Sequence, residues 1–413
     1  MSTASDEGAT SLLPALLAGT LGASPIALGV VEGLASAADG VARLGGGALS
    51  EDPRRRRWIS TGSYTVMAAL TGLIAVAATS AQVAVLRATA AGARGLRSPQ
   101  RYAAVPEFTD TGGYGRAFGF ERGLHHLVSA AGPLLGFLAL VALDVRGAML
   151  VTVVPGVVAA VVGIALLRRS PVPTTRPVPA KLQVRAVYRG TLGRLMAGIT
   201  LFEAVNFAAV LLILRATTLL GRQDVPFGPA AMAVLLYLLW RLAAAVAAPS
   251  CGRLVDRVGP VAVMAGGVGA LLGSYAGFAF AEGTVAQLAL CFALAGAAGG
   301  AIEAAEHVGV ARYAPESLRF SAFGALSAVR SFGRLTATVG ATVVWTALGP
   351  QWGMLIAAPM MVAAVAVMAR GDRRVIPPVS PRGRRVGAAV VLVALPVVVA
   401  ALLVALGLVR PYS

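Results

Sequence analysis

The sequence has little charge, few aromatic residues and almost no cysteine. Of its 413 residues, 13% are charged and 6% are aromatic, whereas 57% are hydrophobic. A chain of this composition, with a mean hydropathy of +0.78, cannot bury its apolar side chains in one water-soluble core, so lipid must solvate much of it. Its two cysteines, Cys251 and Cys291, have no metal-ligand spacing with histidine or with each other, and they indicate neither a disulfide nor a metal site.

Sequence motifs of pumps and enzymes are missing as well. We find no Gly-x-x-x-x-Gly-Lys-Ser/Thr loop to hold nucleotide phosphates, no Gly-x-Ser-x-Gly nucleophile turn and no zinc-ligand spacing. The adjacent His125 and His126 would point about 100 degrees apart on a helix, so they cannot share the face that binds a metal. The sequence therefore predicts a protein that is not an enzyme and that uses no cofactor and no metal.

Positive charge is abundant, since the formal net charge is +17. Nearly all the arginines lie in short connectors between apolar segments, and no basic face with interleaved aromatic residues is present to follow a phosphate backbone. The charge therefore indicates membrane topology and not nucleic-acid binding. A polar start without basic residues, Met1–Gly8, also argues against a cleavable signal peptide.

Windows of about 19 residues identify the apolar segments that are expected to span a membrane. The first segment is shorter than the roughly 20 residues of a full span, so helix one is predicted to be short or truncated. The segments are 9–21, 26–48, 58–79, 81–97, 118–143, 147–167, 194–218, 229–249, 260–281, 284–306, 320–346, 351–369 and 387–409.

Two basic connectors divide these segments into domains. The longer connector is rich in proline and arginine, as expected of a linker between two helical bundles. We predict an N-terminal six-helix bundle at 1–167, a cytoplasmic linker at 168–193, a C-terminal six-helix bundle at 194–370, a basic cytoplasmic connector at 371–386 and an additional transmembrane helix at 387–413.

Arginine is distributed unequally between alternate loops. One set contains Arg54–Arg57, the 168–193 linker and the 371–386 connector, whereas the other contains little beyond Arg146, Arg222 and Arg410. Because basic loops stay in the cytoplasm, we expect a multi-pass protein of the cell inner (plasma) membrane with a cytoplasmic N-terminus. We also expect the cytoplasmic arginines to contact anionic lipid headgroups.

An internal repeat relates the two sides of the linker. Gly47-Ala-Leu49-Ser-Glu51 recurs as Gly252-Arg-Leu254-Val-Asp256, 205 positions later, and Ala117-Phe-Gly119 recurs as Ala322-Phe-Gly324 at the same offset. Equal offsets at separate places indicate two similar halves. Since each half has six segments and begins on the same side, we predict an all-α fold of two bundles related by a pseudo-two-fold axis along the membrane normal.

These residues resemble the major facilitator superfamily of transporters. The repeated loops, which we call the latch loops, are similar to its signature loop, and their named residues are Gly47, Leu49, Glu51 and Arg54 in the first copy and Gly252, Leu254, Asp256 and Arg257 in the second. Arg87 stands where many members have an arginine linked to proton coupling. Gly132-Pro133 resembles the antiporter-type motif of drug exporters, and the run Gly115–Arg122 is similar to bacterial efflux-type members.

The chain departs from this pattern at several positions. Asp52-Pro53 follows Glu51 in the first latch loop, and Ala90, Ala91 and His125 stand where the efflux-type branch implies charged residues. In the latch loops we expect glycine to allow close helix approach and the acid to lie near a helix terminus or an arginine. Such a latch would favour one access state of the transporter.

Several charged residues lie within the apolar segments, where a charge usually faces a cavity and a partner. Glu32, Asp39 and Arg43 fall on one helical face, and Asp39 is a candidate for proton exchange or, alternatively, for a static ion pair with Arg43. Other candidates for the substrate or proton pathway are Arg87, His125, Glu203, Asn206, Arg241, Glu303, Arg330 and Arg334.

The alternative interpretation of these charges is mutual pairing. The sequence has five buried acids (Glu32, Asp39, Glu203, Glu303, Glu306) and five buried bases (Arg43, Arg87, Arg241, Arg330, Arg334). We predict a monomeric transporter that works by alternating access and exports a small organic molecule or drug in exchange for protons. A proton-coupled importer, or a transporter-like scaffold that has lost coupling, remain as alternatives.

Overall fold

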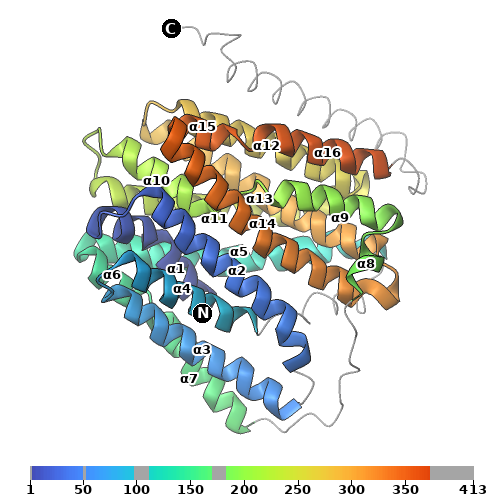
Figure 1. Ribbon diagram of the computed structural model, residues 1–413, viewed down its shortest axis with the longest axis horizontal. Helices are drawn as coiled ribbons and strands as arrows, with labels where there is room; N and C mark the ends of the chain where they lie inside the picture. Colours follow the sequence, from blue (N-terminus) through green and yellow to red (C-terminus); the bar gives the residue numbers. More distant parts are fainter. Residues whose placement is uncertain (1, 50–52, 97–110, 170–182, 373–413) are drawn as a thin grey trace.

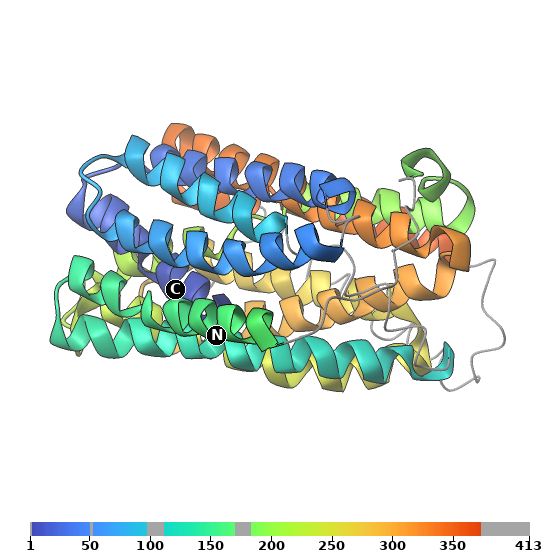
Figure 2. The same ribbon diagram turned by 90° about the horizontal axis from the view of Figure 1, so that it is seen from below.

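The computed structural model describes residues 2–49, 53–96, 111–169 and 183–372. Within these ranges the secondary structure is helical and contains no strand, as the sequence predicts. Figure 2 shows the helices side by side along the long axis of the molecule. By length and composition, seven spans in these ranges can cross a membrane: Pro25–Arg43, Tyr114–Ala142, Val145–Ala165, Gly228–Val258, Pro260–Phe280, Val285–Tyr313 and Pro350–Arg370.

The N-terminal half occupies the lower part of Figure 1. A π-helical turn, η1, continues α1 without a break, and a 3-10 turn, η3, precedes α5. The elements are α1 (Ser2–Pro14), η1 (Ala15–Thr20), α2 (Pro25–Leu49), α3 (Pro53–Ala75), α4 (Ser80–Gly95), η3 (Thr111–Gly113), α5 (Tyr114–Ala142), α6 (Val145–Val151) and α7 (Val154–Arg169).

The C-terminal half occupies the upper part of Figure 1. Its elements are α8 (Val184–Val187), α9 (Gly190–Glu203), α10 (Ala209–Leu220), α11 (Gly228–Val258), α12 (Pro260–Phe280), α13 (Val285–Tyr313), the 3-10 turn η4 (Glu316–Leu318), α14 (Arg319–Leu348), α15 (Pro350–Leu355) and α16 (Ala358–Asp372). Residues 373–413, which include the predicted additional helix, lie outside the described ranges.

The start of the first helix differs from the prediction. The sequence placed this start at residue 9, but α1 begins at Ser2 and includes the polar run that precedes residue 9. A hydropathy window rejects this run because it contains Asp6 and Glu7. Both carboxylates pair with arginines of other helices, so the run is compatible with a buried helix.

Local sequence signals explain where several helices begin. Thr79, Asp144 and Thr284 are N-caps whose side chains accept hydrogen bonds from backbone N–H groups in the first turn of α4, α6 and α13. Gly259 and Gly349 have φ values of 91° and 100°, and each is followed by a proline that opens the next helix. One residue therefore connects α11 to α12, and one connects α14 to α15.

The two halves meet where α5 packs against α11. Gly115, Gly119 and Gly123 recur every fourth residue on the face of α5 that contacts α11. A Cβ atom on Gly119 would lie 2.7 Å from the carbonyl oxygen of Ala248, and one on Gly123 would lie 2.9 Å from that of Ala245. Glycine thus permits the two backbones to approach directly, as small residues do between membrane helices.

A second contact between the halves joins α2 to α14. On α2, a Cβ atom on Gly33 would lie 2.8 Å from side-chain carbons of Leu335 and Val339, and one on Gly40 would lie 2.9 Å from the Cβ of Ser331. The two copies of the Ala-Phe-Gly repeat also meet, since the rings of Phe118 and Phe323 are 5.9 Å apart between centroids. These contacts bring charged residues of both halves close together.

Candidate functional site

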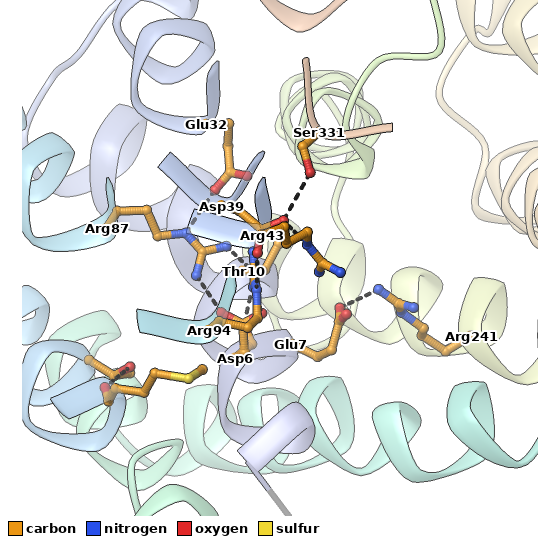
Figure 3. A network of polar contacts seen from close by, with 12 residues as sticks. Asp6, Glu7, Thr10, Glu32, Asp39, Arg43, Arg87, Arg94, Arg241 and Ser331 are labelled. Atoms are coloured by element: carbon orange, nitrogen blue, oxygen red, sulfur yellow. Dashed lines mark hydrogen bonds and ion pairs between the residues drawn. The ribbon is translucent and has the colours of Figure 1, made fainter. Parts of the chain in front are cut away.

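Three acids and three arginines in the first four helices form what we call the N-terminal charge cluster (Figure 3). Arg87 donates to Glu32 over 3.0 Å, and Arg94 donates to Asp39 over 3.3 Å. Seven residues separate the two acids on α2, and seven separate the two arginines on α4. The members of the cluster are Asp6, Glu32, Asp39, Arg43, Arg87 and Arg94.

Asp6 connects the two ion pairs of this cluster, Arg87–Glu32 and Arg94–Asp39, which we call its rungs. Its Oδ1 accepts a hydrogen bond of 2.8 Å from Arg87, and its Oδ2 pairs with Arg94. Thr10, one turn further along α1, accepts a hydrogen bond of 2.5 Å from Arg87. Two guanidinium groups are therefore held between carboxylates of α1 and α2, and each is hydrogen-bonded as a buried charge requires.

Asp39 connects the N-terminal cluster to the other half of the molecule. Arg43 donates to its Oδ2 over 2.7 Å, which is the static i, i+4 pair considered from the sequence. The hydroxyl of Ser331 on α14 donates to the same oxygen over 3.0 Å. Asp39 thus accepts hydrogen bonds from α2, α4 and α14 together.

Glu7 links α1 to α11 through a second set of polar contacts. The hydroxyl of Tyr237 donates to Glu7 over 2.7 Å, and Glu7 also pairs with Arg241. Arg241 donates to the Tyr237 hydroxyl over 2.7 Å and lies over the Trp240 ring, 4.5 Å from its centroid. The guanidinium of Arg241 is therefore held by a carboxylate, a phenol and an aromatic face.

Three carboxylates surround Arg330 in the C-terminal half. Arg330 lies 2.7 Å from Glu306, 3.4 Å from Glu203 and 3.7 Å from Glu303, measured between nitrogen and oxygen atoms. Glu203 and Glu306 are buried. We call these four residues the C-terminal charge cluster.

Glu303 extends this cluster to α5 in the N-terminal half. Its Oε2 lies 3.2 Å from Nε2 of His126 and 3.8 Å from Arg122. Nδ1 of His126 lies 3.4 Å from a nitrogen of Arg241. Because an arginine can only donate, Nδ1 of His126 is the acceptor in this contact, and the ring lies between Arg241 and Glu303.

Glu203 ends α9 beside a break in the helix. Residues 204–208 separate α9 from α10 and are not helical. Within this break, the side-chain amide of Asn206 donates to Glu203 over 3.2 Å, and its Oδ1 accepts a hydrogen bond of 3.4 Å from the Tyr275 hydroxyl. Interrupted helices of this kind line binding sites in transporters because their backbone groups are available to a ligand.

The second latch loop holds the two halves together at one end. The Asp256 carboxylate accepts hydrogen bonds from the backbone N–H groups of Gly115 and Arg116, over 2.8 and 3.1 Å. Arg312 lies 3.9 Å from the same carboxylate. Asp256 therefore caps the first turn of α5, where an acid is favoured by the helix dipole.

The structure brings some of the predicted site residues into the polar contacts described above, whereas others are exposed or are not described. It brings Glu32, Asp39, Arg43, Arg87, Arg241, Glu203, Asn206, Glu303 and Arg330 into the contacts above. His125 is half-buried, with its ring beside that of His126, whereas Arg334 and Arg257 are exposed. Glu51 lies outside the described residues, as do the side chains of Leu49 and Arg54, whereas Gly47 is described as part of the α2 backbone.

Sequence reasoning missed Asp6, Glu7, Arg94 and Tyr237. Arg94 was not singled out within the apolar segment 81–97, but it lies in the last turn of α4 and pairs with Asp6 and Asp39. The i, i+4 spacing of Asp6 and Thr10 was the available signal for a polar face on α1. Among the described residues, no group of three or more His, Cys, Asp or Glu side chains is arranged to hold a metal ion.

The sequence matches one protein family, and the fold is similar to those of solved transporters. The family description "Major Facilitator Superfamily" matches residues 1–286 and 196–409. The fold is similar to that of the nucleoside transporter NupG (14% identity, 91% of this chain and 97% of that chain covered, TM-score 0.70). It is also similar to the human organic anion transporter MFSD10 (15% identity, 89% and 97% covered, TM-score 0.61).

A bacterial homologue of the iron transporter ferroportin, in its outward-facing state, is similar too (15% identity, 90% and 97% covered, TM-score 0.60). A comparison with curated protein sequences finds no match. At such identities the solved structures support the fold alone, but the family match extends over both halves of the sequence. The chain belongs to the major facilitator superfamily, whose members are membrane transporters.

Proposed function

We propose that this protein exports a small organic molecule in exchange for protons by alternating access. One observation carries the proposal: charged side chains of both halves converge at the boundary between them. Glu303 of α13 lies 3.2 Å from His126 of α5, and Asp39 of α2 accepts a hydrogen bond from Ser331 of α14. Buried charge that spans a boundary changes its partners when the halves move apart, which couples protonation to access.

Asp256 supplies a contact that must break and reform in such a cycle. We propose that this end of the molecule is cytoplasmic and that the Asp256 cap on α5 stabilises the state closed at that end. The first latch loop would act in the same way on the other side of the pseudo-two-fold axis. The remaining cytoplasmic arginines, including the exposed Arg257, would bind anionic headgroups of the inner membrane.

The purified, full-length protein in liposomes tests this proposal. A pH gradient is imposed in either direction, and flux is measured for a panel of drugs, sugars, nucleosides and organic anions. We expect accumulation of at least one compound against its gradient when protons flow the opposite way. Accumulation in the same direction as the protons would identify an importer. Absence of gradient-dependent flux for every compound would contradict transport coupling and favour a scaffold.

A further inference from the structure

The two charge clusters differ in their balance of acids and bases. In the N-terminal cluster, three carboxylates face three guanidinium groups, and Glu7 has its own partner in Arg241. In the C-terminal cluster, Arg330 is the guanidinium that contacts all three carboxylates. A buried, uncompensated negative charge is costly in a membrane protein, so the C-terminal cluster requires further positive charge.

Neighbouring arginines supply only part of this charge. Arg122 approaches Glu303 at 3.8 Å, but it also donates to its own neighbour Glu121, over 2.6 and 2.8 Å. Arg334 acts electrostatically on Glu203 from an exposed position on α14. Glu306 is the most deeply buried of the three acids, at 0% exposure, and pairs with Arg330.

Glu306 also has an unsatisfied oxygen. Two nitrogens of Arg330 both approach its Oε2, at 2.7 and 2.9 Å. Its Oε1 is buried and has no hydrogen-bond partner among the described residues. A buried carboxylate oxygen without a donor is unfavourable, whereas a protonated oxygen no longer needs one. Oε1 of Glu306 is therefore the oxygen at which a bound proton would remove the need for a hydrogen-bond donor.

A metal ion is a poor alternative for the missing charge. The acids around Arg330 do not form a group of three or more ligands that could hold a metal, when the described residues are searched. The guanidinium occupies the space between the carboxylates, where such an ion would have to lie. A single proton on one oxygen needs no such geometry.

We infer that Glu306 binds the coupling proton, while Arg330, shared with Glu203 and Glu303, holds the deprotonated carboxylate. In this step a hydronium ion on one side gives a proton to Oε1: an O–H bond of the hydronium breaks and leaves water, an O–H bond forms on Glu306, and the charge of the carboxyl group rises from −1 to zero. On the other side the O–H bond breaks and the proton returns to water. The coupling role rests on the proposed function, but proton binding at Glu306 is a separate, measurable property.

Other titratable groups around Glu306 are the alternative binding sites for the proton. Glu203 comes from α9, Glu303 and His307 from α13, and His126 from α5. His307 donates a hydrogen bond of 2.7 Å from Nδ1 to the backbone carbonyl of Glu303, and its ring packs against those of Phe118 and Phe323. A proton on Glu203 or on a histidine, in place of Glu306, would also neutralise the cluster, so the experiment must distinguish them.

Infrared difference spectroscopy of the full-length protein in lipid vesicles does so, with the proton as the ligand. As pH falls, protonation of a carboxyl group adds a C=O band that shifts in heavy water. We expect this band in the wild type and in the control Asp39→Asn, which lies in the other cluster, and its loss in Glu306→Gln. A band that survives in Glu306→Gln, or that disappears in Glu203→Gln instead, would overturn the inference.

Two further measurements keep the outcome decisive. If Glu306→Gln does not fold, Glu306→Asp replaces it, and an unchanged band frequency in that variant would count against Glu306. In liposomes, the panel compound with the largest wild-type flux should still exchange at equal pH in Glu306→Gln but lose accumulation driven by the gradient. If no compound is transported by the wild type, the proposed function fails while the infrared result still decides where the proton binds.

Discussion

The carboxylate of Asp256, in the C-terminal half, accepts a hydrogen bond of 2.8 Å from the backbone N–H of Gly115, in the N-terminal half. This bond caps α5 from outside its own bundle. It therefore exists only while the two halves are closed at this end.

Replacing Asp256 with alanine should favour opening at this end. Loss of a helix cap costs about 1 kcal/mol, which corresponds to roughly a fivefold shift between two states. Double electron–electron resonance measures the distance between spin labels at the exposed positions Phe120 and Arg253 after removal of the native cysteines. The variant should show a larger fraction of long distances than the protein with Asp256.

Asp144→Ala is the matched control for this experiment. Asp144 caps α6 by accepting from the backbone of Gly147 over 2.9 Å, but both residues belong to the same half. The control should lose a similar cap without moving the distance distribution. An equal shift in both variants would mean that Asp256 does not hold the halves together.

Adding one methyl group at Gly252 should separate α5 from α11. Its Cβ would meet the carbonyl oxygen of Gly115 and would lie 2.9 Å from the Cα of Gly119, so backbone atoms must move. We expect Gly252→Ala to lower the free energy of unfolding by about 1–3 kcal/mol. Thermal unfolding in detergent measures the change.

Gly340→Ala provides the comparison, because a Cβ at Gly340 would meet nothing within 4 Å. Gly340 lies inside α14, where alanine should stabilise by about 0.5–1 kcal/mol. Destabilisation of the same size at both glycines would show that helix propensity, and not contact with Gly115, governs the effect.

Removing the guanidinium of Arg87 should be strongly destabilising. Arg87→Met leaves Glu32 buried without its ion-pair partner and takes one of two arginines from Asp6, a loss expected to cost about 3–5 kcal/mol. The double variant Arg87→Met with Glu32→Gln should recover part of this loss. A coupling free energy near zero in the double-mutant cycle would contradict the pairing.

The Tyr237 hydroxyl should contribute more to stability than an exposed phenol does. Tyr237→Phe removes one hydrogen bond to Glu7 and two from Arg241, and hydrogen bonds to charged groups contribute about 1.5–3 kcal/mol. In Tyr188→Phe the lost hydroxyl bonds Thr200 at an exposed site, and the change should stay within about 0.5 kcal/mol. Chemical unfolding in detergent compares the two variants, and similar losses would reject the difference.

The family and the helical fold were readable from the sequence because they leave local or repeated signals. The 205-residue offset relates loops of the two halves, and the spacing of Asp39 and Arg43 predicts their contact. The topology expected from the arginine-rich connectors stays a prediction. Each of these signals lies within one segment or repeats at a fixed distance.

The pairing of buried charges between helices was not readable. Asp6 meets Arg94 after 88 positions, and Glu32 meets Arg87 after 55. A hydropathy window records Asp6 and Glu7 as polar whether or not an arginine compensates them. For the same reason, the equal number of acids and bases in the sequence could not show that one guanidinium group, that of Arg330, contacts three carboxylates.

The paired spacing of seven residues on α2 and α4 also limits how the first bundle can deform. A shift of one helix along the other by a single turn, about 5.4 Å, would part Glu32 from Arg87 and Asp39 from Arg94 simultaneously. The two ion pairs thus oppose sliding of α2 along α4, and we expect these two helices to move together as a rigid body. Motion during transport is then expected at the glycine-lined contact between α5 and α11, where the hydrogen bonds and ion pair of Asp256 must break for α5 to tilt.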